Sequence, residues 1–163
     1  MLSGLSKLIT DTPQFGRLVE QLQSGQREAL SIFPPARALL LGALWQPLEV
    51  PVLVVAPRPD DARRLYDQLL VYWGEKAPIH HFVELEALPF ERLTVDTVTT
   101  HQRLRALAAL AGFYPHERPP LVVASASGLA VKTLRPEMFQ VKESYTVLRR
   151  GDKVSLAPLL ARH

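Results

Sequence analysis

Two short runs of aliphatic residues limit the fold of this chain more than any other feature of its sequence. Residues 51–56 read Pro-Val-Leu-Val-Val-Ala, and residues 121–124 read Leu-Val-Val-Ala. Branched aliphatic residues favour strands, and strands that lack polar alternation are typical of parallel sheets covered on both faces. We therefore expect both runs to form strands of one parallel sheet, each buried on its two faces.

Segments with helical periodicity separate these strands from further strand candidates. In the helical segments, apolar residues recur at intervals of three and four, as on the buried stripe of a helix. The expected strands cover residues 28–33, 51–56, 79–83, 121–124 and 144–149, and helices are expected to begin near residues 13, 36, 60, 97, 125 and 155. This alternation predicts an α/β fold in which a mostly parallel sheet carries helices on both faces.

Local signals mark the ends of several helices. Thr12 can cap a first turn, and Pro13 suits the first helical position, where a missing N–H costs nothing. Gly25 follows the end of the same periodic segment. Asp60 and Asp61 fall in the first turn of the helix that is expected to begin near residue 60, where negative charge is favourable.

The predicted organisation has three parts. Residues 1–24 form an N-terminal helical extension, residues 25–150 form the α/β domain, and residues 151–163 begin a further subdomain. The total of 163 residues is close to the size of one ordinary domain.

Composition excludes several classes of protein. The chain has no cysteine, so disulfides, thiolate zinc sites and cysteine nucleophiles are excluded. No apolar run approaches the roughly 18 residues of a membrane-spanning helix, and the N-terminus lacks the pattern of a signal peptide. We therefore expect a cytoplasmic protein with no membrane partner.

Positive charge is concentrated in the last third of the chain. Residues 1–100 carry 9 basic and 12 acidic side chains, whereas residues 101–163 carry 10 and 4. Such an excess points weakly to an anionic partner. The candidate contacts to a partner or to nucleic acid are six side chains, with a solvated surface as the alternative interpretation: Arg149, Arg150, Lys153, Arg58, Arg63 and Arg64.

The corner after the first expected strand is where a nucleotide phosphate would bind. A phosphate loop needs glycines that let backbone N–H groups surround the anion, and a lysine that reaches the outer phosphates. The corner instead consists of five residues: Phe33, Pro34, Pro35, Ala36 and Arg37. Its two prolines remove two N–H donors, and no Gly-Lys-Ser/Thr occurs in the chain. The sequence predicts a degenerate phosphate loop, no bound cofactor and no ATP hydrolysis.

Other polar residues favour structural roles. Adjacent His80 and His81 point to opposite faces of a strand, so they cannot both ligate one metal simply. Ser125 and Ser127 lack the flanking glycines of a nucleophile elbow, and helix capping is the favoured interpretation. Three carboxylates of an expected loop have no evident partner: Glu84, Glu86 and Glu91.

Several stretches, in this order and spacing, carry a family resemblance. They are residues 51–57 with 61–67, residues 87–93 followed by 101–104, residues 121–125 leading to 134–139, and the closing residues 147–153. Together they resemble the N-terminal module of the transcription-repair coupling factor family (Mfd), which is similar to the first domain of the excision-repair subunit UvrB. The likeness covers residues 25–163.

The resemblance implies a helicase-like (RecA-like) domain related to P-loop NTPases. UvrB has a complete phosphate loop, whereas the coupling factor module is degenerate at this place, as this chain is. The family implies a multidomain protein that recognises stalled RNA polymerase, moves along DNA with an ATP-driven C-terminal motor and recruits UvrA. This chain would be a non-catalytic subdomain whose partners are the rest of its own polypeptide and, through other domains, UvrA, RNA polymerase and DNA.

Besides a binding module unrelated to repair, two alternatives remain open at the level of sequence. One is half of an ATP-dependent DNA helicase or excision-repair subunit, which would complete an ATP site with a second domain. The other is an autonomous nucleic-acid-binding module that uses Arg149, Arg150 and Lys153.

Overall fold

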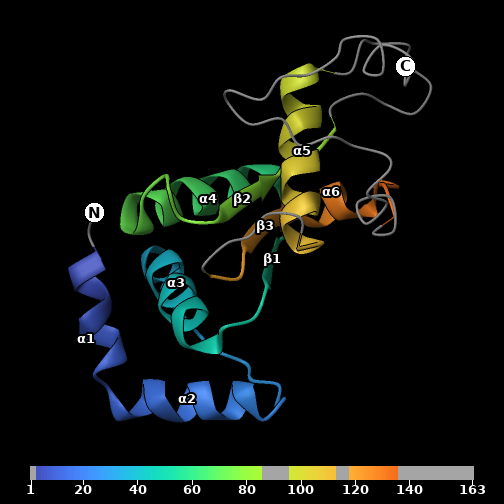
Figure 1. Ribbon diagram of the computed structural model, residues 1–163. Coiled ribbons are helices and arrows are strands. Elements are labelled where there is room, and N and C mark those ends of the chain that lie inside the picture. The colour runs from blue at the N-terminus through green and yellow to red at the C-terminus, as the bar shows by residue number, and fades with distance from the viewer. Residues whose placement is uncertain (1–2, 86–95, 113–117, 136–163) are drawn as a thin grey trace, which may run out of the picture.

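A computed structural model describes residues 3–85, 96–112 and 118–135 of the chain (Figure 1). In chain order the elements are η1 (Ser3–Ser6), α1 (Lys7–Thr10), α2 (Pro13–Gln23), η2 (Pro34–Ala36), α3 (Arg37–Leu48), β1 (Val52–Ala56), α4 (Pro59–Trp73), β2 (Ile79–Phe82), α5 (Thr97–Leu110), β3 (Leu121–Ser125) and α6 (Ala126–Ala130). The expected strand 144–149 and the expected elements after residue 135 lie outside the described residues.

The three strands form one parallel sheet in the order β1-β3-β2. β3 is central, with Val54 opposite Val123 on one side and His81 opposite Val123 on the other. Every residue of β3 is buried. The predicted parallel sheet within an α/β fold is thus confirmed for the described part of the chain.

One predicted strand is wrong. Residues 28–33 have no regular structure, and most of the segment is exposed. Leu30 and Phe33 are 49% and 76% exposed, and only Ile32 is partly buried. A segment that buries so little apolar surface gains nothing by joining the sheet, even though its composition suits a strand.

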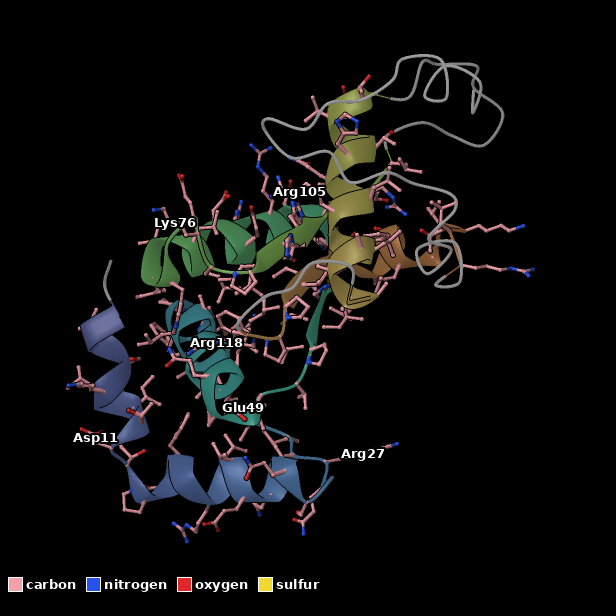
Figure 2. The ribbon with its side chains drawn as sticks, in the orientation of Figure 1. Asp11, Arg27, Glu49, Lys76, Arg105 and Arg118 are labelled. Atoms are coloured by element: carbon pink, nitrogen blue, oxygen red, sulfur yellow. The ribbon has the colours of Figure 1, made fainter. Side chains whose placement is uncertain are left out.

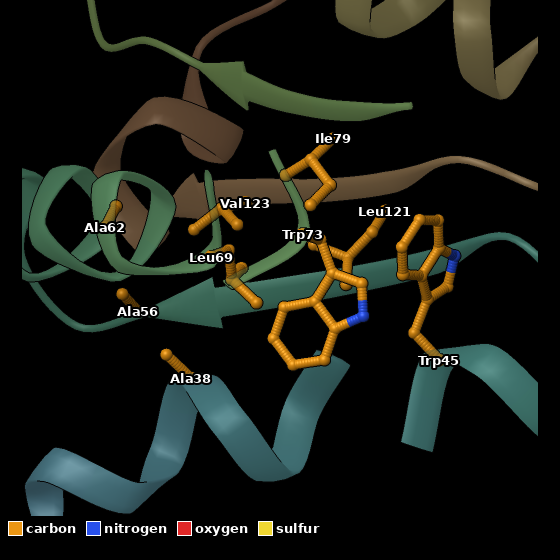
Figure 3. Close-up of a cluster of buried hydrophobic side chains, with 9 residues drawn as sticks. All are labelled: Ala38, Trp45, Ala56, Ala62, Leu69, Trp73, Ile79, Leu121 and Val123. Carbon is orange, nitrogen blue, oxygen red and sulfur yellow. The ribbon is translucent and has the colours of Figure 1, made fainter. Parts of the chain in front are cut away.

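α3 and α4 cover one face of the sheet, and their side chains form the main core (Figures 1 and 3). Trp45, Leu69 and Trp73 fill the space between the helices and strands β1 and β3. Gly42 permits this packing, because a Cβ there would lie 2.4 Å from the ring of Trp73. The indole N–H of Trp45 donates to the carbonyl of Pro119 at 2.8 Å, which ties α3 to the segment before β3.

α5 lies on the opposite face, so the prediction of helices on both faces is confirmed (Figure 1). Its residue Ala106 packs with Phe82, Val122 and Ala124 of the sheet. The buried residues of α5 are Arg103, Ala106, Ala108 and Ala109, whereas Leu104 and Ala111 are only partly buried.

On its face of the sheet, α5 packs against β2. Among the described residues, no helix covers β1 on that face. Leu53 and Val55 are therefore 47% and 52% exposed. The prediction that residues 51–56 are buried on both faces was wrong, because β1 lies at the edge of the described sheet and, among the described elements, packs against α3 and α4 on one face only.

The N-terminal helices follow the sequence signals closely. The hydroxyl of Thr12 accepts a hydrogen bond from the N–H of Phe15 at 3.4 Å, and Pro13 begins α2. Phe15 and Leu18 pack against Ala43 of α3.

The predicted domain boundaries at residues 24 and 150 stay predictions. None of the helices in the described ranges is long and apolar enough to cross a bilayer.

Candidate functional site

The predicted degenerate phosphate loop lies beside the carboxyl end of β1. Pro34–Ala36 form a single 3₁₀ turn that leads into α3, and the N–H of Ala36 donates to the carbonyl of Phe33 at 2.9 Å. Ala38 at the start of α3 packs in the same cluster as Ala56 and Ala62 (Figure 3). The corner therefore reaches the expected edge of the sheet, but it follows an irregular segment where a strand was predicted.

Residues of this corner offer few groups to an anion. The prolines have no N–H, the Ala36 N–H is used within the turn, and Arg37 is exposed on the first turn of α3. Nothing among them forms the ring of backbone donors that a triphosphate requires.

The adjacent turn from β1 into α4 is unfavourable for an anion as well. Pro59 begins α4, and Asp60 and Asp61 occupy its first turn, as predicted. Their negative charges stabilise the positive end of the helix, and the same charges repel a phosphate group from it. The two helix starts at this edge, α3 and α4, therefore both lack the chemistry of phosphate binding.

The other strand ends at this edge are joined by a polar network. The hydroxyl of Ser125 accepts the N–H of Gly128 at 2.9 Å, so Ser125 caps α6 as predicted. The hydroxyl of Ser127 donates to the carboxylate of Glu84 at 2.9 Å and lies 3.3 Å from that of Ser125. Glu84 thus has a partner, contrary to the sequence-based expectation; Glu86 and Glu91 lie outside the described residues.

A buried arginine completes this network. Arg103 of α5 donates to the carbonyl of Val83 at 2.6 Å, and its guanidinium lies 3.9 Å above the ring of Phe82. A longer contact of 3.5 Å reaches the carbonyl of Gly128. Burial lowers the pKa of Arg103, and the nearby Glu84 carboxylate opposes that shift. The network holds β2, α5 and α6 together, and within it the Ser125 hydroxyl caps α6.

Three of the six predicted basic contacts lie on α4 or next to its start. Arg58 is the N-cap residue of α4, and Arg63 and Arg64 lie on its exposed surface. Arg63 is close enough to His81 to contribute to lowering its pKa. The second predicted cluster, Arg149, Arg150 and Lys153, lies outside the described residues.

Sequence analysis missed a groove along the edge of β2 with which no other described strand pairs. Its volume is about 350 Å³, which is within the usual size range of ligand sites. It is lined by residues of α4, β2, α5 and the α4–β2 connection: Tyr66, Leu70, Glu75, Ala77, Ile79, His80, His81, Gln102 and Arg105. Only the paired histidines were noticeable in the sequence, because the groove depends on which strand lies at the edge.

Aromatic stacking and opposite charges shape this groove. The rings of Tyr66 and His81 stack at 5.2 Å with their planes 20° apart. Burial raises the pKa of Tyr66, Arg105 opposes that shift, and Asp67 and Glu75 add to it. Burial also lowers the pKa of His81. His80 and His81 alternate across the strand as predicted, since their neighbours Ile79 and Phe82 pack on opposite faces.

No group of three or more potential metal-ligating side chains gathers within residues 3–85, 96–112 and 118–135. Comparison of the chain with protein-family models and with curated proteins gives no match.

Proposed function

We propose that this chain is a catalytically silent, helicase-like subdomain of a transcription-repair coupling factor. In this role it is a scaffold: it supports the neighbouring insert that recruits UvrA and packs against the ATP-driven motor of the same polypeptide. RNA polymerase and DNA are partners of the full-length protein through its other domains.

The observation that carries the proposal is the chemistry at the carboxyl edge of the sheet. An NTPase of this fold class binds phosphate where a strand turns into a helix. At this edge the chain has Pro34 and Pro35 before α3, and Pro59, Asp60 and Asp61 at the start of α4. Prolines remove donors and carboxylates repel phosphate, so the arrangement favours a scaffold over an enzyme.

The sequence resemblance supports the same interpretation. The stretches that carry it include β1 with the start of α4, and β3 with Ser125, which caps α6. These elements lie side by side in the sheet, since β1 pairs with β3 along its whole length. The resemblance thus rests on neighbouring parts of one structural unit.

Calorimetric titration with ATP and Mg²⁺ tests the silent character of the domain. We expect no heat of binding at micromolar nucleotide. Binding at micromolar strength would contradict the proposal and revive the alternative in which this domain is half of an ATP site. A mobility-shift assay at low salt addresses the other alternative, because an autonomous DNA-binding module has a steep salt dependence.

The gene that encodes the chain tests the family assignment separately. If the proposal is correct, the same reading frame also encodes helicase motor motifs after residue 163. A stop codon directly after His163 in the natural transcript would contradict the assignment to a coupling factor, whatever the nucleotide titration shows.

A further inference from the structure

The outer edge of β2 presents backbone groups that no other described residue pairs with. The N–H of Leu121 donates to the carbonyl of Pro78 at 2.9 Å, and Ile79 stands opposite Leu121. In a parallel ladder, alternate residues direct their backbone groups to the same neighbour. Residues 78, 80 and 82 therefore face β3, whereas residues 79 and 81 face outward.

Of the two outward-facing residues, Ile79 already donates its N–H to the carbonyl of Ala77 at 2.7 Å. The carbonyl of Ile79 and both backbone groups of His81 remain for a further strand. In the described part of the chain β2 pairs only with β3. Open strand edges of this kind bind extended segments by adding them to the sheet.

The two walls of the groove differ in chemistry. Tyr66 and Leu70 of α4 form a largely apolar wall, whereas Gln102 and Arg105 of α5 form a polar, positively charged wall. Figure 2 labels Arg105 of α5. Side chains of an added strand alternate between these walls, because successive residues point to opposite faces.

We propose that the open edge of β2 binds an extended segment of a partner protein in which apolar and acidic residues alternate. The segment adds a fourth strand through hydrogen bonds to Ile79 and His81. Its apolar side chains contact Leu70 and Tyr66, and its carboxylates pair with Arg105. This docking surface goes beyond the scaffold role and does not depend on it.

Two observations select this occupant. First, Arg105 lines the groove and is exposed, so its charge is available to a carboxylate. Second, the edge lies at the bottom of a groove with α4 and α5 as its walls, which admits a single extended chain more readily than a second sheet with its own flanking helices. Glu75 also lines the groove and disfavours an acidic ligand, so its neutralisation is expected to strengthen binding.

Fluorescence anisotropy of labelled, end-blocked peptides with the whole chain tests the proposal. The probe is Thr-Val-Glu-Val-Glu-Thr, and its matched control is Thr-Val-Lys-Val-Lys-Thr. We expect the acidic peptide to bind about tenfold more tightly than the lysine peptide, corresponding to one charge-assisted contact. Equal affinity, or no binding of the acidic peptide at millimolar protein, would overturn the proposal.

Variants of the chain locate the contact. Arg105→Glu is expected to reverse the order of the two peptides, and Glu75→Gln to tighten the acidic one. Arg17→Glu, on the exposed surface of α2, makes the same charge change away from the groove and is expected to leave both affinities unchanged. An equal response to Arg17→Glu and Arg105→Glu would show that only net charge matters, which overturns the assignment to β2.

Backbone methylation separates strand addition from simple ion pairing. Two versions of the acidic peptide are made, each N-methylated at alternate residues. One version lacks the backbone N–H donors that would face β2, and the other lacks the N–H donors that would face solvent. Strand addition predicts that only one of the two loses binding. If both peptides bind like the parent, the contact is not a strand; if both lose binding, the alternating pattern is absent and the proposal fails.

Discussion

The two faces of the sheet are stabilised by different kinds of side chain. On the α3/α4 face, Trp45 and Trp73 pack around Leu69, with Gly42 giving Trp73 the room it needs. On the α5 face, Arg103 lies over Phe82 and donates to a backbone carbonyl. One face thus depends on close packing of apolar rings, and the other on a directional contact of a buried cation.

The faces also differ in extent. The α3/α4 cluster includes residues of all three strands, whereas the α5 cluster draws on β2 and β3 alone. Burial therefore follows a strand's position in the sheet, because the aliphatic β1 is covered on one face and the aliphatic β3 on both. Substitutions on each face can test how strongly the two modes of stabilisation differ.

The largest effect is expected from Trp73→Ala. Removing this ring leaves a cavity next to Gly42 and Leu69, and such truncations cost about 3–5 kcal/mol in the free energy of unfolding. Urea denaturation followed by circular dichroism measures the change. Trp73→Phe, which retains most of the ring volume, serves as the control, and an equal loss in both variants would contradict a cavity as the cause.

A smaller loss is expected from Arg103→Met on the opposite face. Methionine fills similar space but leaves the carbonyl of Val83 without its donor, which costs about 1–3 kcal/mol. Arg105→Met, at an exposed position of the same helix, is the matched control and should change stability by no more than about 0.5 kcal/mol. If the two variants are equally stable in urea, the buried hydrogen bond does not stabilise the α5 face.

A pH-dependent loss of stability is expected from His81, whose ring packs on Tyr66 of α4. Burial lowers the pKa of His81 in the folded chain, Asp67 opposes this shift, and Arg63 adds to it. The neutral ring is therefore favoured by folding. Its stabilisation is present above the ordinary histidine pKa of about 6.5 and is lost as the pH falls below that value.

Urea midpoints of the wild-type chain and His81→Asn, measured from about pH 7.5 down to about pH 5, isolate this contribution from the other histidines. The difference between the two chains should shrink toward acid. A difference that stays constant or grows toward acid would contradict the predicted sign.

The smallest effects are expected from Leu53→Thr and Val55→Thr on the open face of β1. Both side chains are about half exposed, so each change should stay within about 0.5 kcal/mol. Val123→Thr in the fully buried β3 is the contrasting variant and should cost clearly more. A large loss from Leu53→Thr would show that this face is covered in solution.

Sequence patterns predicted what local chemistry decides. Thr12, Asp60 and Ser125 mark helix starts where expected, because a cap depends on neighbours within one turn. The burial of β3 followed in the same way from its uninterrupted aliphatic run. The parallel sheet with helices on both faces could thus be predicted without knowing the order of its strands.

What depends on strand order could not be predicted. The aliphatic residues of 51–56 resemble those of β3, yet only β3 is central and covered on both faces. Burial of Arg103 depends on the ring of Phe82 and the carbonyl of Val83, which are about twenty positions away in the chain. The groove likewise needs α4, β2 and α5 side by side, which no single stretch of sequence encodes.

The central position of β3 governs the timing of assembly on the ribosome. Among the three described strands, β1 and β2 do not pair with each other, and each pairs with β3, which is the last of the three to be synthesised. No strand pairing of this sheet can begin until residues 121–125 have left the exit tunnel. Until then the nascent chain displays the aliphatic β1 and the histidine-containing β2 without their partner, a state that holdase chaperones bind, and slow synthesis across residues 83–121 would prolong it.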